Sequence, residues 1–292
     1  PGLIATTSWW GQYDAPYTLF LVLALMALNR KRPILAWIMF GLAVLVKQPA
    51  VVLAPILLVV TFRRYDWRKT VLGIAASVGV YAAVSLPFAL STGIENALTP
   101  YLRASDAFPY LSNNAYNLWF ALASLHKGAV ILFREPAYLD SIAMFGGISY
   151  KWIGLLLFGS FALLIMAVCW RQMGEQREFV WASALFFGFF ILPTQVHERY
   201  LYPAVVLLLI AVAQDERVAW TALLAVITYS YNIYAVALSD LWNIPLITPY
   251  GLALPIALIN VVIFLFLVCW TVFDGMRQQA VRPLSPVSAA SS

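Results

Sequence analysis

The stretch that decides the fold runs from Ile34 to Phe62 and reads ILAWIMFGLAVLVKQPAVVLAPILLVVTF. Lys47, Gln48 and Pro49 divide it into two apolar runs, each about 20 Å long as a helix at about 1.5 Å per residue. A basic side chain at the centre of a membrane helix costs about 2.5–3.5 kcal/mol, and proline ends a helix because it lacks an N–H donor. The stretch therefore predicts two short membrane helices with a polar break between them.

The whole chain shares this apolar character. Of its 292 residues, 63% are hydrophobic and 11% are charged, whereas a soluble domain has about 45–50% apolar and about 25% charged residues. The composition excludes a soluble enzyme, a disordered chain and a nucleic-acid-binding domain, and it predicts an all-α, polytopic membrane bundle. Two histidines are too few for a multi-histidine metal centre, and the two cysteines lie in apolar runs that indicate neither a disulfide framework nor a metal site.

The predicted fold has about nine membrane helices and one long outer loop, Ser91–Lys151. The nine apolar segments are Ala15–Leu28, Ile34–Val46, Ala50–Phe62, Thr70–Leu90, Trp152–Trp170, Phe179–Leu192, Tyr200–Ala213, Val218–Leu238 and Tyr250–Phe273. We assign residues 1–281 to one transmembrane domain, and we expect its first helices and first outer loop to lie upstream of Pro1. The Pro-, Ser- and Ala-rich residues 282–292 are predicted to form a disordered cytoplasmic tail.

Basic residues predict the orientation of these helices. Alternate turns place twelve Lys and Arg residues on one side and six on the other, with net charges of +6 and −1 that together give the +5 of the chain. The positive-inside rule makes the first side cytoplasmic. The long loop, Lys47 and the sequence His197-Glu198-Arg199 then face outward.

Helix length predicts a recessed site on the outer side. Four segments reach the roughly 20 residues that span a hydrocarbon core of about 30 Å, whereas five have only 13 or 14. Polar turns anchor the short segments on the cytoplasmic side, so their outer ends stop below the outer surface. Polar backbone at that depth must be buried in protein or line a wet cavity. The motifs at these ends, Trp9–Asp14, Lys47–Pro49 and His197–Tyr200, therefore predict one outward-facing cavity.

The first motif has two interpretations. Asp14 either only caps the following helix, with Pro16 in the first turn, or it presents a carboxylate to the cavity. In the second interpretation Gln12 adds an amide and Trp10 a stacking surface, which suits the hydroxyls and the apolar face of a sugar. An interfacial aromatic belt would explain the tryptophans equally well.

The other two motifs carry the cations. Lys47 either extends to the interface or, together with Gln48, lines a site for an anionic group such as a lipid phosphate. His197, Glu198 and Arg199 either form an ordinary loop cap with an ion pair or supply a proton shuttle and a phosphate-binding guanidinium.

Amides and a tryptophan in the long loop and in the spans complete the candidates. Asn114, Asn117 and Trp119 are predicted to form a polar, aromatic wall over the cavity, and Trp119 to begin a short interfacial helix. Asn232 and Asn260 lie within spans, where we expect interhelical hydrogen bonds.

Together these motifs resemble those of the GT-C membrane glycosyltransferases. The resemblance rests on Trp10-Gly11-Gln12-Tyr13-Asp14, Lys47-Gln48-Pro49, Asn114-Ala115-Tyr116-Asn117-Leu118-Trp119 and His197-Glu198-Arg199-Tyr200, which follow one another in the family's order over residues 9–203. Within this superfamily the motifs resemble those of the bacterial relatives of the GPI-anchor mannosyltransferases.

The resemblance implies an inverting transfer of a sugar, with mannose favoured, from a polyprenyl-phosphate carrier to a lipid, glycan or protein hydroxyl on the extracytoplasmic face of a bacterial plasma membrane. It places Lys47, His197 and Arg199 near the donor phosphate. It also implies catalytic roles for His197 and Glu198 and a substrate-binding role for Tyr200. The family's main carboxylate base lies in the first outer loop, so Asp14 would assist, and residues 1–292 alone would be inactive. No cofactor is implied; a divalent metal is compatible with the family, but nothing in the sequence requires one.

Two other classes of function stay open. A transporter or flippase of lipid-linked saccharides also needs an aromatic, cationic cavity, but it would show inverted repeats and paired broken helices. The break at Lys47 has no matching partner in the second half of the chain. A purely structural subunit would leave the charge of Lys47 within the membrane unexplained.

Overall fold

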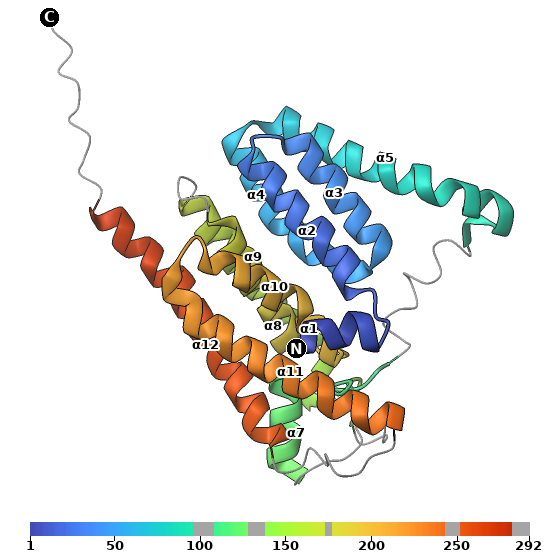
Figure 1. Ribbon diagram of the computed structural model, residues 1–292, viewed down its shortest axis with the longest axis vertical. Helices are drawn as coiled ribbons and strands as arrows, with labels where there is room; N and C mark the ends of the chain where they lie inside the picture. The colour runs from blue at the N-terminus through green and yellow to red at the C-terminus, as the bar shows by residue number, and fades with distance from the viewer. Residues whose placement is uncertain (96–107, 128–137, 173–176, 243–251, 282–292) are drawn as a thin grey trace, which may run out of the picture.

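The computed structural model describes residues 1–95, 108–127, 138–172, 177–242 and 252–281 (Figure 1). This part of the chain is largely helical, with one short hairpin. The elements are α1 (Gly2–Ile4), a π-helix (Ala5–Trp9), α2 (Asp14–Asn29), α3 (Pro33–Val46), a 3-10 helix (Gln48–Leu53), α4 (Ala54–Arg64), α5 (Trp67–Thr92), α7 (Leu118–Lys127), β1 (Ala143–Phe145), β2 (Ile148–Ser149), α8 (Tyr150–Arg171), α9 (Glu178–Ile191), a 3-10 helix (Glu198–Leu201), α10 (Tyr202–Val212), a 3-10 helix (Glu216–Val218), α11 (Ala219–Trp242) and α12 (Ala253–Val281). The predicted tail, residues 282–292, lies outside the described residues.

Four helical stretches in the described residues are long and apolar enough to cross a membrane. They are Trp67–Thr92, Tyr150–Arg171, Glu216–Leu238 and Ala253–Phe273, which confirms the four long segments expected from the sequence. The other five segments form helices of 11 to 16 residues. The chain is therefore an integral membrane protein, and the total of about nine spans stays a prediction.

The break between the two short runs of residues 34–62 has a defined structure. α3 ends at Val46, and Lys47 is extended, with φ −157° and ψ 127°. A 3-10 helix with Pro49 in its first turn follows before α4 begins at Ala54. A second segment, predicted as one helix from Tyr200, is likewise divided into a 3-10 turn and α10. Both interruptions place buried or half-buried polar side chains at the ends of short helices.

The helices pack in two groups, which meet where α4 packs on α8, α2 on α10 and the 3-10 helix Gln48–Leu53 on α9. In the first group α2 lies against α3, and α3 against α5; in the second, α9 contacts α8, α10 and α12 (Figure 1). All residues of α9 except Phe189 are buried, as expected for a helix that is apolar on every side. The 3-10 helix after Lys47 packs on α9, and α2 packs on α10. These contacts bring the two interrupted segments together.

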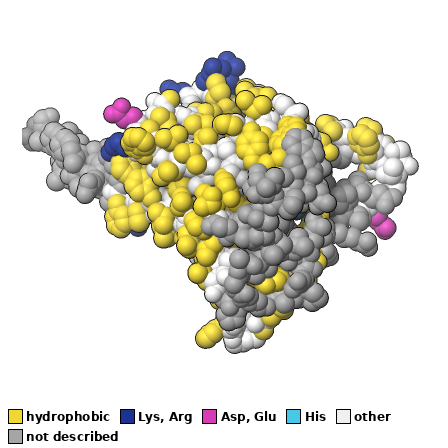
Figure 2. Space-filling view, turned by 60° about the horizontal axis from the view of Figure 1, so that its bottom comes forward, with side chains coloured by type: hydrophobic (Ala, Val, Ile, Leu, Met, Phe, Trp, Pro, Cys, Tyr) yellow, Lys and Arg dark blue, Asp and Glu magenta, His cyan; other side chains and the backbone are white. Residues whose placement is uncertain are grey.

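The outer surface of the bundle is apolar. Figure 2 shows one face on which hydrophobic side chains predominate and the visible charged side chains lie near the margins. α5 illustrates this, because only 6% of its most apolar stretch is buried inside the protein. Such a surface fits contact with lipid rather than with water.

Ion pairs connect the end of α4, the start of α9 and the turn after α10. Arg64 at the end of α4 pairs with the fully buried Glu178 at the start of α9. Asp215 binds Arg217 at 2.8 Å and Arg177 at 3.5 Å. Burial alone would raise the pKa of the Asp215 carboxyl, but hydrogen bonds from Arg217 and the charges of both arginines outweigh it and hold that pKa below its usual value.

Candidate functional site

An ion pair joins the ends of α2 and α3. The carboxylate of Asp14 is completely buried at the first residue of α2, and its Oδ1 accepts a hydrogen bond of 2.6 Å from Lys47 Nζ. The residue in the capping position is Tyr13, and its side chain makes no capping hydrogen bond. Asp14 therefore uses its carboxylate to bind Lys47, which goes beyond the capping interpretation. The Lys47 side chain is 15% exposed and stays within the protein instead of extending to the membrane surface.

Two tyrosine rings surround the ammonium group of Lys47. Its Nζ lies 5.1 Å from the centre of the Tyr200 ring and 5.6 Å from that of Tyr17. Both contacts are within the range of a cation–π interaction. The Tyr200 ring also meets His197 edge-on, with centroids 5.4 Å apart. Tyr200 thus connects two motifs that are 150 residues apart in the sequence.

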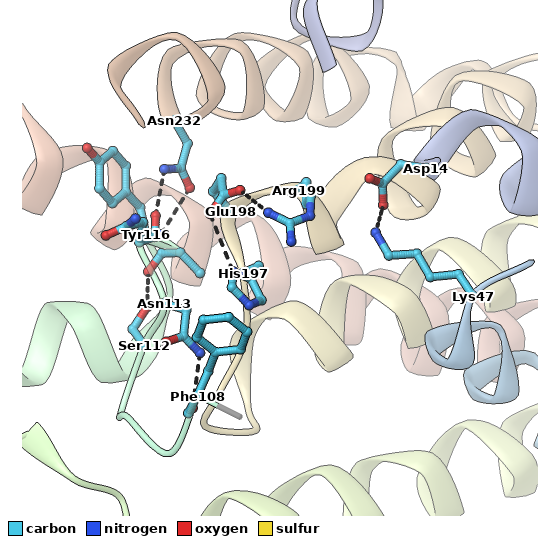
Figure 3. A network of polar contacts seen from close by, with 12 residues as sticks. Asp14, Lys47, Phe108, Ser112, Asn113, Tyr116, His197, Glu198, Arg199 and Asn232 are labelled. Carbon is cyan, nitrogen blue, oxygen red and sulfur yellow. Dashed lines mark hydrogen bonds and ion pairs between the residues drawn. The ribbon is translucent and has the colours of Figure 1, made fainter. Parts of the chain in front are cut away.

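A second ion pair lies next to the first. Arg199 Nη1 donates to Glu198 Oε1 at 2.8 Å, and His197 Nδ1 is 3.9 Å from Glu198 Oε2. Figure 3 shows Arg199 between Glu198 and the Asp14–Lys47 pair. The structure therefore brings together the cations and carboxylates that the sequence placed at the outer ends of short helices.

The segment before His197 is fixed by the long loop. Gln195 has a positive φ of 63°, and its side chain and that of Thr194 donate to the buried Asp140 at 2.9 and 2.7 Å. The backbone N–H of Asn113 donates to the carbonyl of Val196. The loop thus holds the turn that leads into His197.

Three buried polar atoms at this site have no hydrogen-bond partner among the described residues. They are Asp14 Oδ2, the Tyr17 hydroxyl and Arg199 Nε. A buried polar group without a partner costs about 1–3 kcal/mol, so such atoms are rare in folded proteins. One acceptor and two donors gathered around two ion pairs indicate a place for a polar ligand.

The remaining residues predicted in the first two motifs lie nearby on the chain. Trp10 is half-buried and packs on the main core. Gln12 is also half-buried, and its backbone N–H donates to the carbonyl of Thr6. Gln48 is half-buried at the start of the 3-10 helix. Their predicted contacts with substrate stay predictions.

The predicted wall of the long loop has mainly internal contacts. Asn117 Nδ2 donates to the carbonyl of Phe190, and Trp119 Nε1 donates to that of Leu192, both at the end of α9. Asn117 also accepts from the backbone of Phe120, which makes it the cap of α7. Both side chains are buried, so these contacts position the loop, and the expectation that they bind substrate stays a prediction.

Asn114 is held by its backbone. It has a positive φ of 63°, and its carbonyl accepts from Asn232 Nδ2 while Asn232 Oδ1 accepts from the N–H of Tyr116. Asn260 donates to the carbonyl of Tyr116. The two span asparagines therefore bind the loop backbone, where the sequence had suggested bonds between helices.

Two residues of the site were missed in the sequence. Tyr17 lies inside an apolar segment, but it follows Asp14 by three residues and so shares its helix face. That spacing was the signal that could have found it. Asp140 had no comparable signal, because its contacts with Thr194 and Gln195 depend on tertiary structure.

These features define a class of protein. The described part of the chain combines apolar helices of spanning length with a buried, charged site that has unfilled hydrogen-bonding capacity. This combination is typical of a membrane protein that binds a polar ligand.

The comparison with known families makes the assignment specific. Residues 2–194 match the model of glycosyltransferase family 87, which is more than half of the chain, and the chain belongs to that family. It is therefore a membrane glycosyltransferase. The matched residues include Asp14, Tyr17 and Lys47 and end just before His197. No curated protein matches the chain.

Proposed function

We propose that this protein transfers a sugar, with mannose favoured, from a polyprenyl-phosphate carrier to an acceptor hydroxyl on the extracytoplasmic face of the membrane. The reaction is a single displacement with inversion at the sugar carbon. The observation that carries the proposal is that Arg199 lies next to the Asp14–Lys47 pair (Figure 3), where Asp14 Oδ2 and the Tyr17 hydroxyl have no hydrogen-bond partner among the described residues.

The chemistry of these atoms suits a sugar phosphate. The phosphate oxygens would accept from Arg199 Nε, the Tyr17 hydroxyl and Lys47, while a sugar hydroxyl would donate to Asp14 Oδ2. Donors held in place around the leaving phosphate stabilise the charge that develops as the sugar bond breaks. The lipid chain of the carrier would lie against the apolar exterior of the bundle.

The net charge of the site also bears on how it would bind a phosphate. Each is already paired with a carboxylate, so the four residues Asp14, Lys47, Glu198 and Arg199 have no net charge. A bound phosphate adds negative charge, and His197 next to Glu198 can take up a proton to balance it. The acceptor's proton leaves to a carboxylate base, and Asp14 assists that base.

Sugar transfer in proteoliposomes tests the proposal. The full-length protein is given radiolabelled polyprenyl-phosphate mannose and a crude acceptor lipid fraction, alongside the variants Lys47→Ala and Arg199→Ala. Both should lose transfer, whereas the matched control Lys69→Ala, an exposed lysine at the start of α5, should keep it. Transfer that proceeds from a nucleotide sugar without the lipid carrier, or that survives both substitutions, would contradict the proposal.

A further inference from the structure

A hairpin in the long loop exposes an unusual number of apolar side chains. β1 and β2 pair as antiparallel strands, with Phe145 opposite Ile148. Phe145 is 79% exposed, and Ile142, Met144 and Ile148 are also exposed. No residue from 141 to 150 is charged. A two-stranded hairpin with apolar side chains on both faces is a poor structure for contact with water.

The turn of the hairpin has a backbone conformation that suits glycine. Gly146 and Gly147 have φ values of 56° and 84°, the positive values that a two-residue turn of this kind needs and that glycine adopts without strain. At the base, the N–H of Tyr150 donates to the carbonyl of Ile142, and the N–H of Lys151 donates to that of Asp140. Hydrogen bonds therefore fix the base of the hairpin, from which the apolar tip extends.

The hairpin leads directly into a membrane helix. α8 starts at Tyr150 and has 22 residues, about 33 Å at about 1.5 Å per residue, which is enough to span the hydrocarbon core. Trp152 in its first turn is 61% exposed, as is typical of an aromatic residue at the membrane interface. Leu155 and Leu156 continue this exposed surface toward the membrane centre. The hairpin thus borders the lipid-facing surface of α8.

We propose that the β1–β2 hairpin is a membrane anchor of the long loop, with its tip seated among the lipids of the leaflet at the Tyr150 end of α8. The occupant of its apolar surface is lipid. The absence of charge along the hairpin favours the acyl-chain boundary of the leaflet over its charged headgroups.

The base of the hairpin connects this anchor to the site. Asp140 precedes β1 by three positions, and its carboxylate accepts from the side chains of Thr194 and Gln195. These residues precede His197 by two or three positions. A lipid-seated hairpin would therefore fix the height of this turn, and with it the height of the His197–Arg199 segment, relative to the membrane.

Depth-dependent quenching tests the proposal without any need for activity. In the full-length protein with Cys169 and Cys269 replaced by Ala, one cysteine is placed at position 145 (Phe145→Cys) or 144 (Met144→Cys) and labelled with a polarity-sensitive fluorophore. Control labels are placed in the lipid-facing surface of α8 (Leu156→Cys) and in the exposed first turn of α5 (Arg68→Cys). Each protein is reconstituted into vesicles with or without lipids brominated on their acyl chains.

Both hairpin labels should lose fluorescence in brominated lipid, by at least about half of the loss seen for Leu156→Cys, and most strongly when bromine is near the headgroup end of the chain. They should resist aqueous iodide, which should quench Arg68→Cys. Quenching of both hairpin labels by iodide and not by brominated lipid would overturn the proposal. Insensitivity to both quenchers would overturn it as well, because a protein surface would then cover the hairpin.

Discussion

The Asp14–Lys47 pair offers the sharpest test of the site's burial. Lys47→Met removes the charge and keeps most of the side chain's volume, which leaves the Asp14 carboxylate, 0% exposed, without a counter-ion. Loss of one partner from a buried pair costs about 3–5 kcal/mol, because the remaining charge is not compensated. The double variant Asp14→Asn/Lys47→Met removes both charges and should recover most of that loss.

Equilibrium unfolding in mixed detergent micelles, followed by tryptophan fluorescence, measures these free energies in the full-length protein. Lys69→Met is the matched control, since an exposed lysine should change stability by no more than about 0.5 kcal/mol. The reasoning is refuted if Lys47→Met costs only about 0–1 kcal/mol, as for a solvent-exposed pair. It is refuted equally if the double variant is no more stable than Lys47→Met alone.

Three further predictions concern single groups. Tyr17→Phe should lower sugar transfer without lowering stability, because the hydroxyl has no partner among the described residues; a fall in the unfolding midpoint would show that the hydroxyl is used structurally. The pKa of Asp215 is lowered in the folded protein, so the ionised carboxylate stabilises the fold above its unfolded pKa of about 3.9, and this stabilisation is lost as the pH falls through the folded pKa. The difference in unfolding free energy between the native protein and Asp215→Asn should therefore shrink in acid. A difference that grows in acid would mean that the pKa is raised instead. Trp119→Phe removes the hydrogen bond to the carbonyl of Leu192 and should cost about 0.5–1.5 kcal/mol in unfolding experiments, whereas an unchanged stability would mean that this bond does not hold the loop.

Helix lengths and interruptions were largely predictable from the sequence. The four long helices follow from apolar runs of about 20 residues, and the break at Lys47 follows from a charge and a proline in succession. The short helix at Trp119 is confirmed as α7, with Asn117 as its cap. Local rules were sufficient for these features because they depend on neighbouring residues.

The pairing of charges was not predictable by the same rules. The sequence placed Asp14 and Lys47 at similar depth, but their direct contact depends on how α2 packs against α3. The interpretation that left both cations open to phosphate did not include the pair between Lys47 and Asp14. The pair between Arg199 and Glu198 matches the loop-cap alternative. The hairpin had a weak local signal in Gly146-Gly147, but strands of two and three residues are too short to stand out from a loop.

The central claim is that Lys47 and Arg199 bind one phosphate of a lipid-linked sugar. A double-mutant cycle on donor affinity tests it most directly, with Lys47→Ala, Arg199→Ala and the double variant of the full-length protein, each measured on folded material alone. The account predicts that both single variants bind the donor more weakly and that their effects are non-additive by about 0.5–3 kcal/mol, as for residues in one charge network. Strictly additive losses would contradict it, because they would assign the two cations to separate sites.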